Sequence, residues 1–159
     1  MVLFLVLLVL LLGMKAWVVG LTEIKGSSMA PRLVDSTTCL VLRVGKISVL
    51  GLELGSSTAK LGDIVIAEHP SARGRVVKEV AALAGFPAPE GDWQKRLRLS
   101  RDVRGKRLSL PGLDCLKGPC LVAPKHLFLL SAQSAQSSDS RHFGAVPESS
   151  VIGRVGFCF

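Results

Sequence analysis

The fold of this chain is constrained most by a series of short segments rich in Val, Ile and Leu, separated by Gly, Pro and Ser. Short apolar segments broken by turn-forming residues are typical of antiparallel strands. Beyond residue 20, no stretch has the periodicity of an amphipathic helix. The sequence therefore predicts a mainly β domain, built as an antiparallel sheet or barrel. The predicted strands are residues 39–45, 63–67, 75–80, 97–99, 106–110, 126–130 and 150–156.

Residues 1–20 are a different kind of segment, because they are apolar except for Lys15. A helix of about 20 apolar residues can cross a bilayer. No basic region precedes the run and no small-residue cleavage site follows it, which favours a retained anchor over a cleaved signal. The alternative is a buried core helix, but residues 2–12 have no polar face. We predict one transmembrane helix over residues 1–20, in contact with the lipid bilayer, and one domain over residues 21–159.

The net charge is +8, and much of the excess lies in residues 95–107. A patch for nucleic acid or anionic lipid is one interpretation. Leucine and valine side chains interleave with the charges, and residues 104–106 have the composition of a turn. This pattern favours the solvated face of a β-hairpin. Because no aromatic residue accompanies the basic run, we expect no nucleic-acid partner.

The chain has four cysteines. Cys115 and Cys120 close a short loop that contains a Gly-Pro turn, and in an oxidising compartment they would form a disulfide. Free thiols, or half of a zinc site with His126, are the alternatives. No second ligand pair with suitable spacing follows, so we predict no metal and no cofactor. Whether Cys39 pairs with Cys158 stays open.

Two segments carry residues suited to hydrolysis. Ser28 lies in the sequence SSMAP shortly after the predicted anchor, and Lys78 lies in the apolar residues 76–83. A serine hydroxyl is a poor nucleophile until a base takes its proton. Lysine can be that base only when neutral, and burial among aliphatic side chains lowers its pKa. The alternative is a serine in a turn and a lysine at the surface.

Taken together and in this order, the segments resemble the signal peptidase I family of membrane-bound Ser/Lys endopeptidases, over nearly the whole chain. Each matching segment, or box, is a weak signal by itself, but the order of the boxes behind one apolar segment makes the resemblance specific. The matching boxes are residues 26–33 (GSSMAPRL), 62–65 (GDIV), 77–85 (VKEVAALAG), 137–147 (SSDSRHFGAVP) and 152–155 (IGRV).

The resemblance implies a role for each matching residue. Ser28 would be the nucleophile, and its backbone N–H would stabilise the oxyanion. Lys78 would be the general base, Ser137 would orient it, and Asp139 would form a supporting ion pair with Arg141. The family also implies an antiparallel, barrel-like catalytic domain and substrates that are precursor proteins with leader peptides. It further implies a single-pass protein of the inner (cytoplasmic) membrane, with its catalytic domain on the extracytoplasmic side.

A narrower resemblance is to the conjugative-transfer (TraF-type) branch, which matures pilin precursors. It is carried by the basic residues 101–108, the Cys115–Cys120 spacing, residues 127–131 (LFLLS) and residues 139–144 (DSRHFG). This branch implies that the acyl-enzyme is released either by water or by an amine acceptor.

Three places depart from the family pattern. In the family, the late box, which is the segment around Ser-Asp-Ser-Arg, usually begins with Gly-Asp-Asn. Here the corresponding residues 131–133 are Ser-Ala-Gln. The lysine is usually followed by arginine, but here by Glu79, which strand alternation directs away from Lys78. The turn after the base is reduced to residues 83–86.

Two rival interpretations remain. A Ser-His-Asp hydrolase could use Ser28, His142 and Asp139, but no Gly-x-Ser-x-Gly elbow is present. A non-catalytic membrane scaffold subunit of a transfer or secretion apparatus is the second, because the Gly-Asp-Asn sequence is missing.

Overall fold

A computed structural model describes residue 4 and residues 19–43, 47–49, 52–54, 59–99, 110–115, 118–133 and 137–159. Strands dominate this part of the chain, with two short α-helices and one 3₁₀ helix after residue 90. In chain order the elements are β1 (Val19–Ile24), β2 (Thr37–Arg43), β3 (Ile47–Val49), β4 (Leu52–Leu54), β5 (Ile64–Glu68), β6 (Arg75–Leu83), α2 (Asp92–Leu99), β7 (Leu113–Asp114), β8 (Leu121–Val122), β9 (His126–Leu130), α3 (Ser140–Phe143), β10 (Val146–Pro147), η1 (Glu148–Ser150) and β11 (Val151–Cys158).

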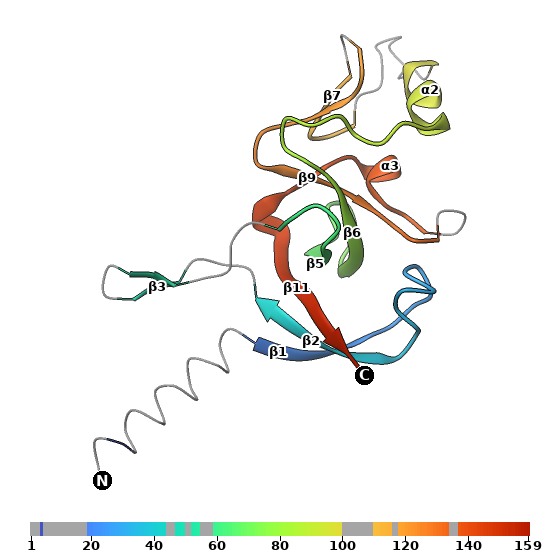
Figure 1. The fold of residues 1–159 in the computed structure, drawn as a ribbon. Coiled ribbons are helices and arrows are strands. Elements are labelled where there is room, and N and C mark those ends of the chain that lie inside the picture. The colour runs from blue at the N-terminus through green and yellow to red at the C-terminus, as the bar shows by residue number, and fades with distance from the viewer. Residues whose placement is uncertain are drawn as a thin grey trace.

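Seven strands form one sheet in the order β1-β2-β11-β5-β6-β9-β10. All neighbouring strands in it are antiparallel, and the sheet curls on itself (Figure 1). β11 follows the other six strands in the sequence yet lies between β2 and β5. The prediction of a mainly β, antiparallel fold is confirmed.

Five of the predicted strands are confirmed as β2, β5, β6, β9 and β11. Burial alternates in β2 and most clearly in β6, where every second residue from Lys78 to Ala82 is buried, whereas β5 and β9 each bury three consecutive residues. The predicted strand over residues 106–110 lies outside the described residues except for Leu110.

The predicted strand over residues 97–99, and with it the start of a β-hairpin over residues 95–107, is wrong, because residues 92–99 form α2. Asp92 lies in the first helical turn, where its negative charge interacts favourably with the helix dipole. Trp93 is buried, with its ring 5.4 Å from that of Phe128. A helix of about two turns is too short for its period to stand out in the sequence.

The predicted membrane anchor, residues 1–20, lies outside the described residues except for Phe4, Val19 and Gly20. The last two belong to β1, where Val19 pairs with Leu42 and Gly20 with Val41. In the part of the chain that the structure describes, no helix combines the length and the apolar character needed to span a membrane.

Two disulfides are present. One joins Cys115 to Cys120 across a separation of 5 residues, and the other joins Cys39 of β2 to Cys158 of β11 across 119. The long-range bond belongs to a buried cluster that also contains Met29, the residue after Ser28. One hydrophobic cluster therefore contains residues of the sheet, of this disulfide and of the loop that carries Ser28.

Candidate active site

Ser28 lies in the loop between β1 and β2, residues 25–36. The backbone N–H of Gly26 donates to Oδ1 of Asp35 at 2.6 Å, which ties the two ends of the loop together. Gly26 has a φ of 107°, a conformation that glycine adopts readily and other residues do not. Met29 is 1% exposed, so it anchors the middle of the loop in the core. Ser28 is partly buried, and its backbone N–H makes no hydrogen bond to any residue that the structure describes.

Lys78 lies in β6 opposite Val65 of β5 and is only 4% exposed. Burial lowers the pKa of its amine, because an ammonium loses its hydration there. The negative charge of Asp139 opposes this effect, and the positive charge of Arg141 reinforces it. Among the described residues, the amine of Lys78 has no hydrogen-bond or ion-pair partner.

Residues 130–133 connect the loop of Ser28 to the strand of Lys78. Gln133 donates its backbone N–H to the carbonyl oxygen of Ser28 at 3.1 Å. Three residues earlier, Leu130 pairs with Glu79, the neighbour of Lys78. The predicted nucleophile and the predicted base therefore lie next to one common segment. No hydrogen bond joins these two side chains to each other in the described part of the chain.

An ion pair provides a second connection between the same elements. Nη1 of Arg32, in the Ser28 loop, lies 2.6 Å from Oε2 of Glu79. Glu79 thus turns to the opposite side of β6 from Lys78, as strand alternation predicts. The sequence marked Glu79 as a departure from the family pattern, but its partner could not be found from local spacing.

Asp139 is fully buried and forms the predicted ion pair with Arg141. Its carboxylate accepts from Nε of Arg141 at 2.9 Å and from Nη2 at 2.5 Å. The backbone N–H groups of Arg141 and Ser131 also donate to it, both at 3.1 Å. Burial alone would raise the pKa of Asp139, but these hydrogen bonds outweigh it, and the pKa lies below its ordinary value. The same contacts raise the pKa of Arg141.

Ser137 lies close to this region but not in the predicted contact. Its hydroxyl donates to the carbonyl oxygen of Gln133 at 2.6 Å. Gln133 is thus bonded to Ser137 on one side and to Ser28 on the other. The structure places Ser137 beside the Ser28 loop, without a hydrogen bond to Lys78 among the described residues.

Ser131 is a residue of the site region to which the sequence assigned no role. Its side-chain oxygen is buried and has no hydrogen-bond partner in the described part of the chain. The only signal for it in the sequence was that serine replaces glycine at the start of the late box.

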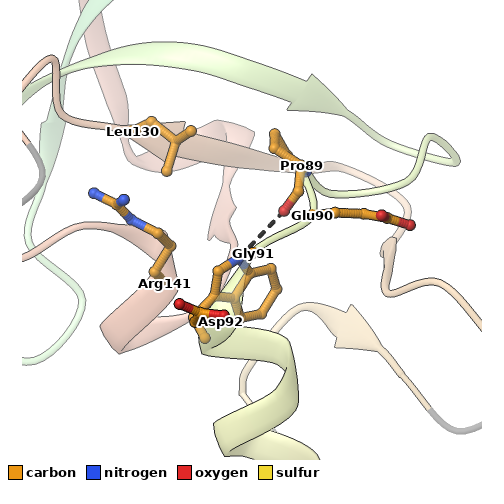
Figure 2. A pocket seen from close by; sticks show the side chains of 7 residues that line it. Pro89, Glu90, Gly91, Asp92, Leu130 and Arg141 are labelled. Carbon is orange, nitrogen blue, oxygen red and sulfur yellow. Dashed lines mark hydrogen bonds between the residues drawn. The ribbon is translucent and has the colours of Figure 1, made fainter.

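A cavity of about 270 Å³ lies beside the Asp139–Arg141 pair (Figure 2). Arg141 and Leu130 line one part of it, and the segment from Pro89 to Trp93 lines the rest. Nε1 of Trp93 donates to the carbonyl oxygen of Pro89 at 3.2 Å, which fixes that segment. Among the described residues, no group of three His, Cys, Asp or Glu side chains could hold a metal ion.

A curled antiparallel sheet that buries a lysine next to a serine-bearing loop defines the architecture of the site. The chain matches the family model described as signal peptidase, peptidase S26, over residues 1–86 and 92–159. It therefore belongs to the signal peptidase S26 family, a family of serine peptidases. A search of the curated proteins finds no match. The predicted family is confirmed, and the assignment to its TraF-type branch stays a prediction.

Proposed function

We propose that this protein is a membrane-anchored serine endopeptidase that removes leader peptides from precursor proteins with Ser28 and Lys78. One observation carries the proposal. Lys78 is 4% exposed with a lowered pKa, and its strand is linked to the Ser28 loop through residues 130–133. A buried ammonium without an ion-pair partner destabilises a fold, so its presence favours a chemical role.

In the proposed reaction, Oγ of Ser28 attacks the scissile carbonyl carbon and its proton passes to neutral Lys78. The backbone N–H of Ser28, which has no partner among the described residues, donates to the oxyanion. The tetrahedral intermediate collapses to an acyl-enzyme, and the amine leaves with the proton from Lys78. Water then attacks the ester carbonyl carbon and gives a proton to Lys78. As the C–Oγ bond breaks, Lys78 returns this proton to Oγ of Ser28, and the carboxylic acid product leaves and ionises in solvent, which restores both side chains.

Asp139 and Arg141 support this chemistry without contacting the substrate. Their ion pair fixes the segment that follows β9 and sets the field at Lys78. Ser137 holds the carbonyl oxygen of Gln133, and Gln133 in turn holds the carbonyl oxygen of Ser28. We infer that Ser137 positions the nucleophile loop instead of binding the lysine directly.

The extracytoplasmic side of the inner membrane is the compartment that we propose for this domain. Two disulfides support it, because such bonds persist in oxidising compartments and are rare in the cytosol. The resemblance of residues 101–108 and 139–144 to the conjugative-transfer branch makes pilin precursors the first substrates to test.

The test is cleavage of a panel of leader-peptide and pilin precursors by the full chain in membrane vesicles, from about pH 6 to about pH 10. We expect Ser28→Ala and Lys78→Ala each to abolish turnover. The double variant should be no worse than either one, because the two side chains act as a unit. Wild-type activity should rise with pH through one ionisation, since only neutral Lys78 accepts a proton.

The neighbouring serine and an exposed lysine supply matched controls. Ser27→Ala and Lys60→Ala remove the same groups at exposed positions and should keep wild-type activity. If Ser28→Ala or Lys78→Ala cleaves as well as wild type, the proposal is wrong. If wild type cleaves no precursor, the non-catalytic scaffold becomes the better account.

A further inference from the structure

The buried hydroxyl of Ser131 is a polar group near the candidate active site that has no role in the proposed mechanism. Its oxygen is shielded from solvent and has no hydrogen-bond partner among the residues that the structure describes. An unpartnered buried hydroxyl lowers stability, and native structures rarely keep one without a reason. Lys78 is buried in the same region and its amine also has no partner among the described residues.

The register of the β6–β9 ladder, continued by one residue past the end of β9, brings these two residues to opposite positions. In the β6–β9 ladder, Val80 pairs with Leu129 and Glu79 pairs with Leu130. The strands are antiparallel, so the next pair in this register is Lys78 with Ser131. Opposite residues of such a ladder have Cβ atoms about 5 Å apart, a distance that the flexible lysine side chain can span.

The two side chains also lie on the same face of the sheet. Val80 and Leu129 pack together in one buried cluster, and residues two positions further along a strand point to the same face. The backbone N–H of Ser131 donates to Asp139, whose charge acts on Lys78. This hydrogen bond holds the Ser131 backbone in place, and the side-chain oxygen of Ser131 is buried.

We propose that the hydroxyl of Ser131 binds Nζ of Lys78 and directs the amine lone pair toward Ser28. Ser131 is then a positioning residue, and this role rests on the proposed function. Neutral lysine has two N–H bonds and one lone pair. When one N–H donates to Oγ of Ser131, this hydrogen bond restricts rotation about the Cε–Nζ bond. The lone pair is then not free to turn away from Ser28. The hydroxyl of Ser137 donates to Gln133 instead, and among the described residues it makes no hydrogen bond to Lys78.

The first measurement is the titration of Lys78 itself. NMR monitors its ¹³Cε and ¹⁵Nζ signals in the full chain as the pH changes, and Lys78→Met identifies which signals belong to Lys78. A hydrogen bond to the ammonium favours the charged form, so Ser131→Ala should shift the titration of Lys78 to lower pH. Ser131→Thr keeps the hydroxyl and should restore the wild-type titration. Other charged groups near Lys78 are unchanged in these variants; they are Asp139, Arg141, the Glu79–Arg32 pair and the Asp63–Arg154 pair.

The second measurement is cleavage of a leader peptide that wild type accepts. Ser131→Ala should lower kcat about tenfold, roughly the contribution of one hydrogen bond, with KM unchanged and the pH profile shifted to lower pH. Ser138→Ala, the same change at an exposed serine of this segment, should alter neither the titration nor kcat.

The outcomes separate this inference from the proposed function. A Lys78 titration that does not move in Ser131→Ala overturns the contact, whatever the activity. A titration that moves while kcat stays within twofold of wild type overturns the positioning role. If Ser28→Ala remains active, the proposed function fails and the catalytic role of Ser131 fails with it, while the titration still decides whether the contact exists.

Discussion

At the scale of single residues, Lys78 shows a conflict between stability and chemistry. Burial lowers its pKa in the folded chain below the value in the unfolded chain. At a pH below the folded pKa, the fold contains a poorly hydrated ammonium. As pH rises from the folded toward the unfolded pKa, the folded state loses the proton first, so stability rises with pH.

Lys78→Met should therefore abolish cleavage but raise the melting temperature near neutral pH. We expect a gain of a few degrees, since about 1 kcal/mol shifts Tm by about 2–4 °C in a chain of this size. The gain should shrink in alkaline buffer, where a larger fraction of wild-type Lys78 is neutral. Thermal unfolding at about pH 7 and about pH 10 checks this, with the exposed Lys60→Met as control. A lower Tm than wild type at about pH 7 would contradict it.

Asp139 has the same sign of pH dependence as Lys78, but in the acidic range. Its folded pKa is depressed, so the stability it contributes is complete above its unfolded pKa and is lost as pH falls through the folded pKa. Asp139→Asn should cost about 3 kcal/mol at neutral pH, because it leaves Arg141 without its charge partner. Denaturant unfolding at about pH 7 and about pH 3 should show the deficit shrinking in acid. Glu23→Gln, in an exposed pair with Lys25, should cost well under 1 kcal/mol.

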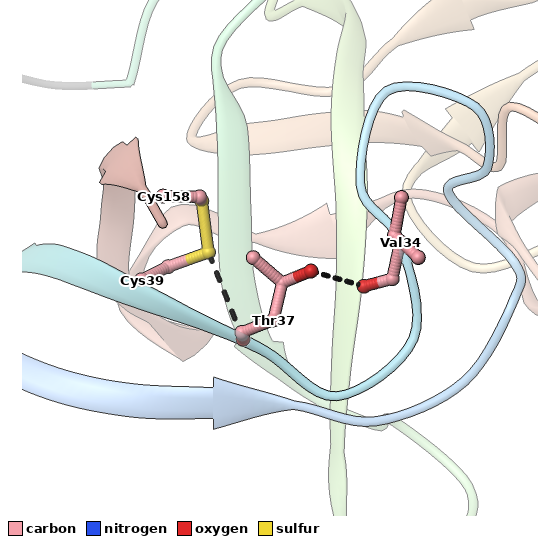
Figure 3. Close-up of a disulfide and its surroundings, with 4 residues drawn as sticks. All are labelled: Val34, Thr37, Cys39 and Cys158. Carbon is pink, nitrogen blue, oxygen red and sulfur yellow. Dashed lines mark hydrogen bonds between the residues drawn. A yellow bond between two sulfur atoms is a disulfide. The ribbon is translucent and has the colours of Figure 1, made fainter.

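At the scale of elements, the two disulfides should stabilise the fold unequally. Cys39–Cys158 joins β2 to β11, beside the hydrogen bond from Thr37 to the carbonyl oxygen of Val34 (Figure 3). It closes a separation of 119 residues, against 5 for Cys115–Cys120. The chain-entropy model gives about 5 kcal/mol for the long loop and about 2 kcal/mol for the short one.

Urea unfolding of the two double-serine variants measures this difference. Replacing Cys39 and Cys158 should also weaken precursor cleavage, because their cluster supports Met29, next to Ser28. Replacing Cys115 and Cys120 is the matched control, and it should leave kcat near the wild-type value. Equal losses of stability from both pairs would contradict the entropic account.

The elements also show how far sequence reasoning reaches. Strands such as β5 and β6 were predictable because their apolar residues are local and bounded by turn residues. α2 was not, because its fold depends on Trp93 packing against Phe128, a residue distant in the sequence. The Cys39–Cys158 bond and the Gln133–Ser28 contact could not be predicted either, because each joins residues that are distant in the sequence. Residue roles could be inferred from the sequence segments that match the family, but the proposed contact between Ser131 and Lys78 required the register of β6 and β9.

At the scale of the whole molecule, β11 connects two parts of the sheet. β1 and β2 lie on one side of it and β5, β6, β9 and β10 on the other. Gly153 is paired with Arg43 across one edge and with Ile66 across the other. A Cβ at Gly153 would lie 2.5 Å from Cγ1 of Val41 and 2.9 Å from the carbonyl oxygen of Leu42. These contacts are too close, so neighbouring strands would have to move.

Gly153→Ala should therefore destabilise the entire sheet, by about 1–3 kcal/mol, and not only its own strand. In a Trp17→Phe background, Trp93 reports on the part of the sheet around β9, because it packs against Phe128. Its fluorescence and the far-UV circular dichroism should shift together to lower denaturant, in one transition. Gly156→Ala is the control, since its Cβ would meet its nearest atom at an ordinary 3.5 Å. If Trp93 unfolds at the wild-type midpoint while the circular dichroism shifts, the two parts of the sheet fold independently and the connecting role of β11 is wrong.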